Sequence, residues 1–198
     1  ILATRLILVI FIDLSASFGT EILAINSLLF QSLVLVSLMT EGVSHATETL
    51  TGNLWGQKLI QQLPGLLRLS SVSGIILGLV GIAPFILFPH FLFSLFTDHN
   101  EIIDGMGVYL LWLIPFTFAS SLFNVLRGYW LGLTESKVLR NSTIMGSSIG
   151  FFPVALAAMH FHNIHILWLA LCTFLTISVF VMGYKFPHWF SMVEKLET

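Results

Sequence analysis

Charged residues are scarce in this chain. Only 9% of its 198 residues are Asp, Glu, Lys or Arg, and 56% are hydrophobic, whereas about 25% of the residues in an ordinary soluble domain are charged. The mean hydropathy of +0.94 is spread along the chain, so neither a signal peptide nor a single anchor accounts for it. The composition therefore excludes an ordinary soluble domain and indicates an integral membrane protein.

Cysteine and clustered basic residues are also nearly absent. Cys172 is the single cysteine, which excludes a disulfide framework or a thiolate metal site within one chain. The formal net charge is -2, and without a basic cluster there is no reason to expect a nucleic-acid partner. Membrane lipid is the first partner that the composition predicts.

Apolar runs long enough to cross the hydrocarbon core occur six times, since a helix needs about 20 residues to do so. None of the runs alternates polar and apolar residues as a barrel strand does, so they predict helices. We therefore expect an all-α integral membrane protein, with six transmembrane helices forming a single domain over residues 1–198. Pro84 and Pro89 in the third run predict a kink or an interfacial end. The runs are 2–18, 22–40, 69–96, 106–126, 142–159 and 164–182.

The distribution of Lys and Arg predicts the orientation, because these residues remain on the cytoplasmic side of short loops. They lie at the start of the first run, between the second and third runs, after the fourth and after the sixth. The other turns, 18–21, 97–105 and 160–165, contain none. This pattern predicts a multi-pass protein of the inner (plasma) membrane with both termini in the cytoplasm. The basic residues are Arg5, Lys58, Arg68, Arg127, Lys137, Arg140, Lys185 and Lys195.

Ionisable residues in the predicted spans are candidates for function, because each costs about 2.5–3.5 kcal/mol at a helix centre on insertion scales. Asp13 lies inside the first span, and Glu41, His45 and Glu48 follow the second at i, i+4 and i+7, on one helix face. The hypothesis is a proton-titrating or cation-binding groove, in which Glu41 matters more than Glu48 because it lies deeper. Alternatively, Asp13 pairs with Asn or Ser of another helix and the other three occupy a solvated helix end. Arg127 is expected to extend to the interface.

Two further patterns match chemical motifs but favour simpler interpretations. His160, His162 and His165 have metal-ligand spacing, but they lie in a short outer turn without a nearby carboxylate or cysteine, so we expect no metal site. Residues 146–150 match G-x-S-x-G, which needs a strand–turn–helix elbow; in a membrane helix the glycines indicate close packing. We therefore expect no enzyme, no catalytic residue and no cofactor. Close packing is also expected of Gly52 with Gly56, Gly74 with Gly78, and Gly128 with Gly132.

Three stretches together resemble the multidrug and toxic compound extrusion (MATE) family of transporters, particularly its DinF-like branch. FGTEILA at 18–24 is similar to the turn between the first two helices of a lobe. EGVSHATE at 41–48, followed by Gly52 and Gly56, is similar to a DinF-like run that begins Asp-Gly and passes through Ala-Thr-Glu to Gly-Gln. LRGY at 126–129 is similar to the end of the fourth helix of a lobe. Here Arg127 stands where DinF-like members often have Asp.

The resemblance implies twelve helices in two six-helix lobes that open alternately to either side. It implies export of organic, often cationic, compounds by antiport, driven by inward flow of protons or sodium ions, with Asp13, Glu41, His45 and Glu48 as the coupling candidates. We assign this chain to the second, C-terminal lobe, because its first span lacks a start. The expected partners are lipid, a small organic substrate, and either a missing first lobe or a second copy. The alternative function is a small self-associating membrane channel or scaffold.

Overall fold

The computed structural model describes residues 2–97 and 99–197, together with their side chains other than those of residues 2, 3, 5, 100 and 187–197. Over this part of the chain the structure is helical and contains no strand, which confirms the all-α class. Arg5 and Lys195, which entered the orientation argument, have side chains outside the described set.

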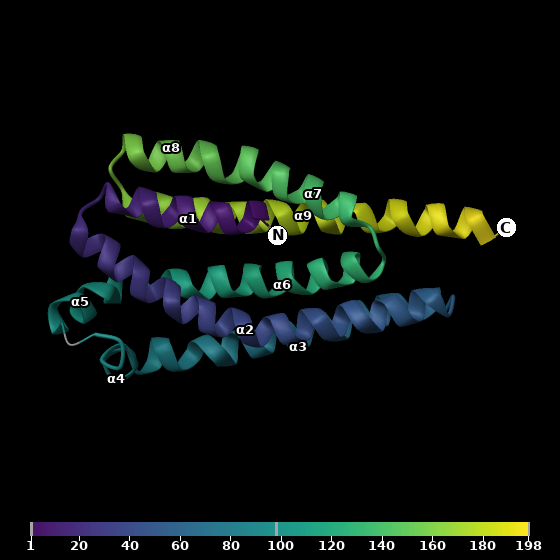
Figure 1. Ribbon diagram of the computed structural model, residues 1–198, viewed down its shortest axis with the longest axis horizontal. Helices are drawn as coiled ribbons and strands as arrows, with labels where there is room; N and C mark the ends of the chain where they lie inside the picture. Colours follow the sequence, from purple (N-terminus) through teal and green to yellow (C-terminus); the bar gives the residue numbers. More distant parts are fainter. Residues whose placement is uncertain (1, 98, 198) are drawn as a thin grey trace.

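Each of the six apolar runs is mainly helical (Figure 1). Among the described residues, five of these segments are long and apolar enough to cross a membrane, and the apolar part of the first that could be assessed is Leu6–Ala16. The fifth run is one bent segment, in which a π-helical turn, Gly146–Phe151, joins α7 to α8. The helices are α1 (Leu2–Ala16), α2 (Thr20–Gly56), α3 (Leu63–Leu87), α4 (Pro89–Phe93), α5 (Asn100–Gly105), α6 (Leu113–Gly132), α7 (Ser136–Met145), α8 (Phe152–His160) and α9 (Ile164–Glu197).

The local sequence explains several helix boundaries. Gly19, between α1 and α2, has φ 116°, which is readily adopted only without a Cβ. Pro84 lies near the end of α3, and Pro89 begins the separate helix α4, so the third run breaks where its prolines predicted. No proline interrupts α2, which continues for 37 residues. The second apolar run and the polar stretch after it therefore form one helix.

The long helices form two groups (Figure 1). The first group contains α2, α3 and α6, which pack against one another, and the second contains α7, α8 and α9. α1 contacts α2, α7 and α9, and α6 contacts α9, so these helices join the groups. In Figure 1, α2 leaves its turn with α1 and runs obliquely across the bundle into the first group.

A buried polar network ties the two groups together near the α1–α2 turn. The Trp168 indole of α9 donates a hydrogen bond to Oδ1 of Asn26 at 3.1 Å, and Nδ2 of Asn26 donates to the Ser15 hydroxyl at 3.0 Å. All three side chains are fully buried. Because buried polar groups need partners, this network fixes how α1, α2 and α9 meet.

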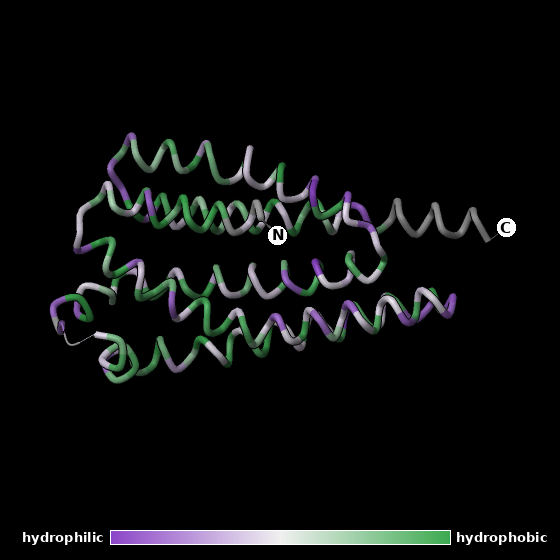
Figure 2. Tube along the Cα trace, in the orientation of Figure 1, coloured by the Kyte–Doolittle hydropathy of each residue, from purple (hydrophilic) through white to green (hydrophobic). Residues whose placement is uncertain are grey.

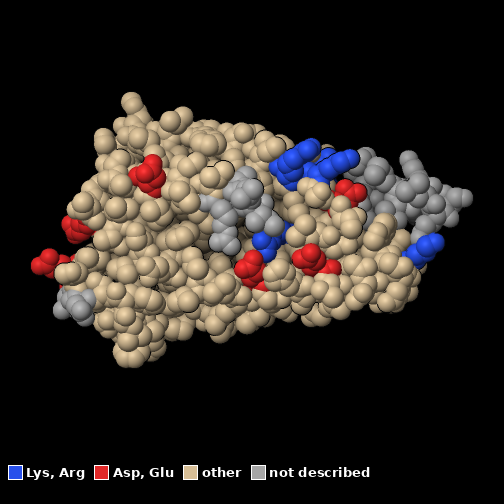
Figure 3. All heavy atoms as spheres, in the orientation of Figure 1, with Lys and Arg blue, Asp and Glu red and all other residues tan. Residues whose placement is uncertain are grey.

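The outer surface of the bundle is mainly apolar, as contact with lipid requires. Figure 2 shows hydrophobic residues along the spans, with hydrophilic residues concentrated toward the helix ends. On the face in Figure 3, the Lys and Arg side chains lie toward the end where α6 leads into α7, and only acidic side chains appear at the opposite end. Large apolar side chains more than 60% exposed include Leu69, Val80, Phe91, Leu156 and Phe180.

Candidate functional site

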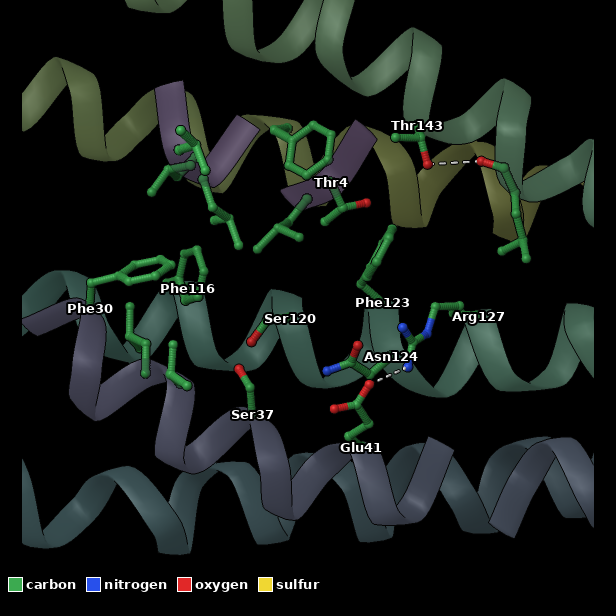
Figure 4. A pocket seen from close by; sticks show the side chains of 18 of the residues that line it. Thr4, Phe30, Ser37, Glu41, Phe116, Ser120, Phe123, Asn124, Arg127 and Thr143 are labelled. Atoms are coloured by element: carbon green, nitrogen blue, oxygen red, sulfur yellow. Dashed lines mark hydrogen bonds and ion pairs between the residues drawn. The ribbon is translucent and has the colours of Figure 1, made fainter. Parts of the chain in front are cut away.

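A cavity of about 1000 Å³ lies between the two groups of helices, lined by residues of α1, α2, α6, α7 and α9. Most of its lining is apolar, and Figure 4 shows Phe30, Phe116 and Phe123 facing the space. We call this space the lobe cavity. An apolar chamber with a few polar groups is the usual composition of a site for small organic molecules.

Two helices supply a line of polar side chains to the lobe cavity. Ser37 and Glu41 are four residues apart on α2, and Ser120, Asn124 and Arg127 follow one another at spacings of four and three residues on α6. Residues three or four apart lie on one face of a helix, so each helix presents a polar stripe. Figure 4 shows the two stripes facing each other, with the charged groups at the end of the cavity nearer Thr143. We call this the α6–α7 end.

The strongest polar contact in the lobe cavity is an ion pair between Glu41 and Arg127. The Arg127 guanidinium donates to the Glu41 carboxylate at 3.1 Å. The Arg127 side chain is 16% exposed and that of Glu41 30%, so both charges are largely withdrawn from solvent. Arg127, for which the sequence predicted an extension to the interface, thus contacts an opposite charge on α2. Charged residues in membrane helices commonly pair in this way.

Hydrogen bonds and a close glycine contact hold α2 against α6 beside this pair. The Ser44 hydroxyl donates to the backbone carbonyl of Asn124 at 2.6 Å, and Nδ2 of Asn124 donates to the Thr40 hydroxyl at 3.2 Å. Gly128 lies directly against the carbonyl of Ser44, where a Cβ would have no room. The two helices thus approach closely enough for Glu41 to reach Arg127.

Arg127 is not fully satisfied by this pair. Its buried Nε has no hydrogen-bond partner among the described residues. A guanidinium carries five N–H donors, and leaving a buried donor unpaired costs about 1–3 kcal/mol. Beside the α6–α7 end, the fold therefore leaves a buried donor unpaired among the described residues.

Asp13 also lines the lobe cavity but belongs to a different part of it. It is exposed and lies nine residues after Thr4 on α1, a distance of about 14 Å along a helix. Thr4 lies across the cavity from Ser120 in Figure 4, so Asp13 lies toward the α1–α2 turn, away from the α6–α7 end. Among the side chains that the structure describes, Asp13 shows no pairing with Asn or Ser, and Asn26 pairs with Ser15 instead.

His45 and Glu48 do not line the lobe cavity. Their side chains are 67% and 40% exposed and lie 3.6 Å apart. The single groove hypothesised for Glu41, His45 and Glu48 is therefore divided: Glu41 faces the cavity, whereas the other two lie farther along α2, on a helix end that extends beyond it.

The residues of the two motif matches make other contacts in the structure. Within the described residues, no group of three or more His, Cys, Asp and Glu side chains is placed to hold a metal ion. His165 instead accepts a hydrogen bond from the Trp112 indole at 3.0 Å. Gly146 and Gly150 lie in a helical segment against Phe174 of α9, with no strand–turn–helix elbow. Of the pair Gly52 and Gly56, only Gly52 has a close neighbour, the Gly132 carbonyl.

The fold and the lobe cavity define a helical membrane protein with a mainly apolar chamber that holds a few charged groups inside its bundle. The sequence profile of the MatE family matches residues 2–157. The chain therefore belongs to the MATE family of membrane transporters, which confirms the resemblance seen in its motifs.

DNA damage-inducible protein F of Escherichia coli (strain K12) is a similar protein, 26% identical over 164 residues. This similarity agrees with the DinF-like character of the motifs. The match covers 83% of this chain and 35% of the E. coli protein, so the chain spans little more than a third of that relative's length.

Proposed function

We propose that this chain forms one lobe, the second and C-terminal one, of a secondary active exporter of organic compounds. The observation that carries the proposal is the lobe cavity, an apolar chamber with charged groups at the depth of the membrane spans, in a chain of a transporter family. Charged groups are costly inside a membrane, and they are characteristic of ion and substrate pathways.

The exporter works as an antiporter that takes up protons or sodium ions and releases organic, often cationic, compounds. Among the coupling candidates, Asp13 and Glu41 line the lobe cavity and are favoured over His45 and Glu48, which lie outside it. When Glu41 takes up a proton, its charge attraction to Arg127 is lost, and the contact between α2 and α6 weakens. No cofactor other than the coupling ion takes part, and no bond of the substrate is broken.

Transport requires a second lobe. Alternating access needs a substrate site between two lobes that rock against each other, and one lobe supplies one wall of it. The partner is a first lobe or, failing that, a second copy of this chain. The assembly lies in the inner (plasma) membrane with both termini of this lobe in the cytoplasm.

The test is export of ethidium, a fluorescent organic cation, by an efflux-deficient bacterial host. The chain is expressed alone and joined behind the first six-helix lobe of a two-lobe MATE transporter; that first lobe alone is the control. We expect energy-dependent extrusion only from the joined protein, abolished by ionophores that collapse the proton and sodium gradients. Gradient-dependent extrusion by the 198-residue chain alone would show that no separate first lobe is needed and would contradict the one-lobe proposal. A joined protein that reaches the membrane but exports nothing would count against the exporter function.

A further inference from the structure

We propose that an anionic phospholipid of the cytoplasmic leaflet binds to the outer side of α7. Lys137 and Arg140 hold its phosphate, and its acyl chains lie along the apolar surface that continues toward α8. We call these two residues the α7 basic pair. The inference goes beyond the proposed function and takes from it only the side of the membrane, so the binding is measured without transport.

The α7 basic pair carries positive charge that no neighbouring side chain balances. Lys137 and Arg140 are three residues apart near the start of α7, so they lie on one side of the helix. Both are exposed, and neither forms an ion pair or a side-chain hydrogen bond with another described residue. Arg127, in contrast, is paired with Glu41. The pair can therefore bind an anion at the surface.

The helix packed against α7 adds to this charge. α9 runs antiparallel to α7 (Figure 1), and the Ser178 hydroxyl of α9 donates to the Ser142 carbonyl at 3.3 Å. Lys185 lies seven residues after Ser178 and Glu135 seven residues before Ser142, so both lie at the level where α7 begins. Lys185 is exposed as well. Among the described residues of these two segments, three positive charges thus lie near one carboxylate.

Apolar side chains continue from the α7 basic pair toward the middle of the membrane. Ile144 follows Arg140 by four residues on the same side of α7, and Ile144, Met145 and Ile149 are 53%, 43% and 59% exposed. Nine residues separate Arg140 from Ile149, about 14 Å along a helix, which is close to half of a hydrocarbon core about 30 Å thick. The segment thus offers a charged end and an apolar length that match one lipid leaflet.

The same segment borders the lobe cavity. Arg140 and Ile144 belong to the lining of the cavity and are exposed, so they lie at its rim. A phosphate bound there would lower the positive charge at the rim. The lipid is a bound component of the lobe and not its cargo, and its negative charge favours the approach of organic cations.

The chemistry of the surface favours a phospholipid over other occupants. Phosphate oxygens accept charge-assisted hydrogen bonds from Lys and Arg, and basic residues at the cytoplasmic surface attract anionic lipids. A soluble phosphate would leave the apolar length without contact. In a two-fold dimer built on this surface, the basic pairs of the two copies would meet and repel.

The test compares phosphatidylglycerol with phosphatidylcholine, which carry the same palmitoyl and oleoyl chains and differ in that choline cancels the phosphate charge. The dissociation constant of the first lipid bound to the full chain in dodecyl maltoside is measured by native mass spectrometry. Each basic residue near an anionic membrane surface contributes a factor of about five in binding. We therefore expect phosphatidylglycerol to bind the wild-type chain at least about tenfold more tightly than phosphatidylcholine. Equal binding would overturn the inference.

Variants assign the site to its residues. The double variant Lys137→Gln/Arg140→Gln should weaken phosphatidylglycerol binding at least about fivefold. Lys58→Gln/Arg68→Gln is the matched control, because it also removes one exposed Lys and one exposed Arg, and it should bind as the wild type does. Lys137→Arg/Arg140→Lys keeps both charges and should retain the preference for phosphatidylglycerol.

Equal losses in the two charge-removing double variants would overturn the site, because net charge alone would then explain the binding. Displacement of the lipid by an equal concentration of its soluble headgroup, glycerophosphoglycerol, would contradict the role of the acyl chains. Unchanged lipid binding with an altered oligomeric state in Lys137→Gln/Arg140→Gln would assign the surface to a second copy instead. If this double variant does not fold, each single substitution should weaken phosphatidylglycerol binding severalfold, and unchanged affinity in both would overturn the inference.

Discussion

At the scale of single residues, the Glu41–Arg127 pair separates the candidate coupling groups into two kinds. Glu41 faces the lobe cavity and has a cationic partner on another helix, whereas Glu48 lies beside the exposed His45 on its own helix. Exposed pairs contribute only about 0–1 kcal/mol. When an ion pair is largely withdrawn from solvent, loss of the charge on one partner changes the free energy more. The two carboxylates of α2 should therefore differ in their importance for transport.

We predict that Glu41→Gln lowers ethidium efflux more than Glu48→Gln in the joined two-lobe protein. Loss of coupling between ion and substrate should reduce the initial efflux rate about tenfold, since coupling between sites is commonly 5- to 150-fold. Glu48→Gln, the matched control on the same helix, should keep most of the wild-type rate. Equal and near-normal rates from the two variants would place the lobe cavity outside the transport path.

At the scale of helices, the α2–α6 contact decides whether the lobe cavity forms. These helices approach closely at glycines. Because the hydrophobic effect does not drive helices together in lipid, van der Waals packing at such close contacts stabilises the association instead. Gly128 lies against the Ser44 carbonyl, and a Cβ on Gly132 would meet the Glu48 carbonyl oxygen at 2.5 Å. Backbone atoms cannot rotate out of the way as a flexible side chain can, so these positions require glycine.

We predict that Gly128→Ala destabilises the folded chain by about 1–3 kcal/mol, the usual cost of forcing an extra group into a packed site. Gly56→Ala adds the same methyl group at the end of α2, where nothing lies within 4 Å, and should cause no loss. Cys172 is buried and is the single cysteine, so its reaction with a thiol-reactive dye during heating in detergent reports unfolding. Equal unfolding temperatures for the two variants would show that α2 and α6 do not depend on this close approach.

At the scale of the whole molecule, the helix lengths and the distribution of charged residues fit one orientation of the chain across the membrane. The Lys and Arg residues concentrate at the end where α6 leads into α7 (Figure 3), and the opposite turns lack them. A basic bias of this kind sets orientation, because cationic loops are retained in the cytoplasm.

We predict that position 100 lies outside the cell and position 136 inside. Single cysteines replace Asn100 and Ser136 in a chain whose Cys172 has been changed to Ala, and intact cells are treated with a membrane-impermeant thiol reagent. Position 100 should be labelled in intact cells, and position 136 only after the cells are opened. The reverse pattern would invert the topology.

The sequence by itself determined the class of protein and its helices. Hydrophobicity and proline positions act locally, because each span must satisfy its own backbone hydrogen bonds in lipid. This is why the long α2 and the break between Pro84 and Pro89 could be predicted from the residues alone. The motifs likewise identified the family, since they are read directly from consecutive residues.

Only the tertiary structure decided which ionisable groups share a site. Glu41 and Arg127 are 86 positions apart in sequence, and nothing in the local pattern of either predicts the contact; an opposite charge on another span was the single available signal. Helical spacing correctly placed Glu41, His45 and Glu48 on neighbouring turns of α2, but it could not show where the cavity ends. That limit is set by how α1, α6, α7 and α9 pack around α2, and packing depends on long-range contacts such as the one between Gly128 and Ser44.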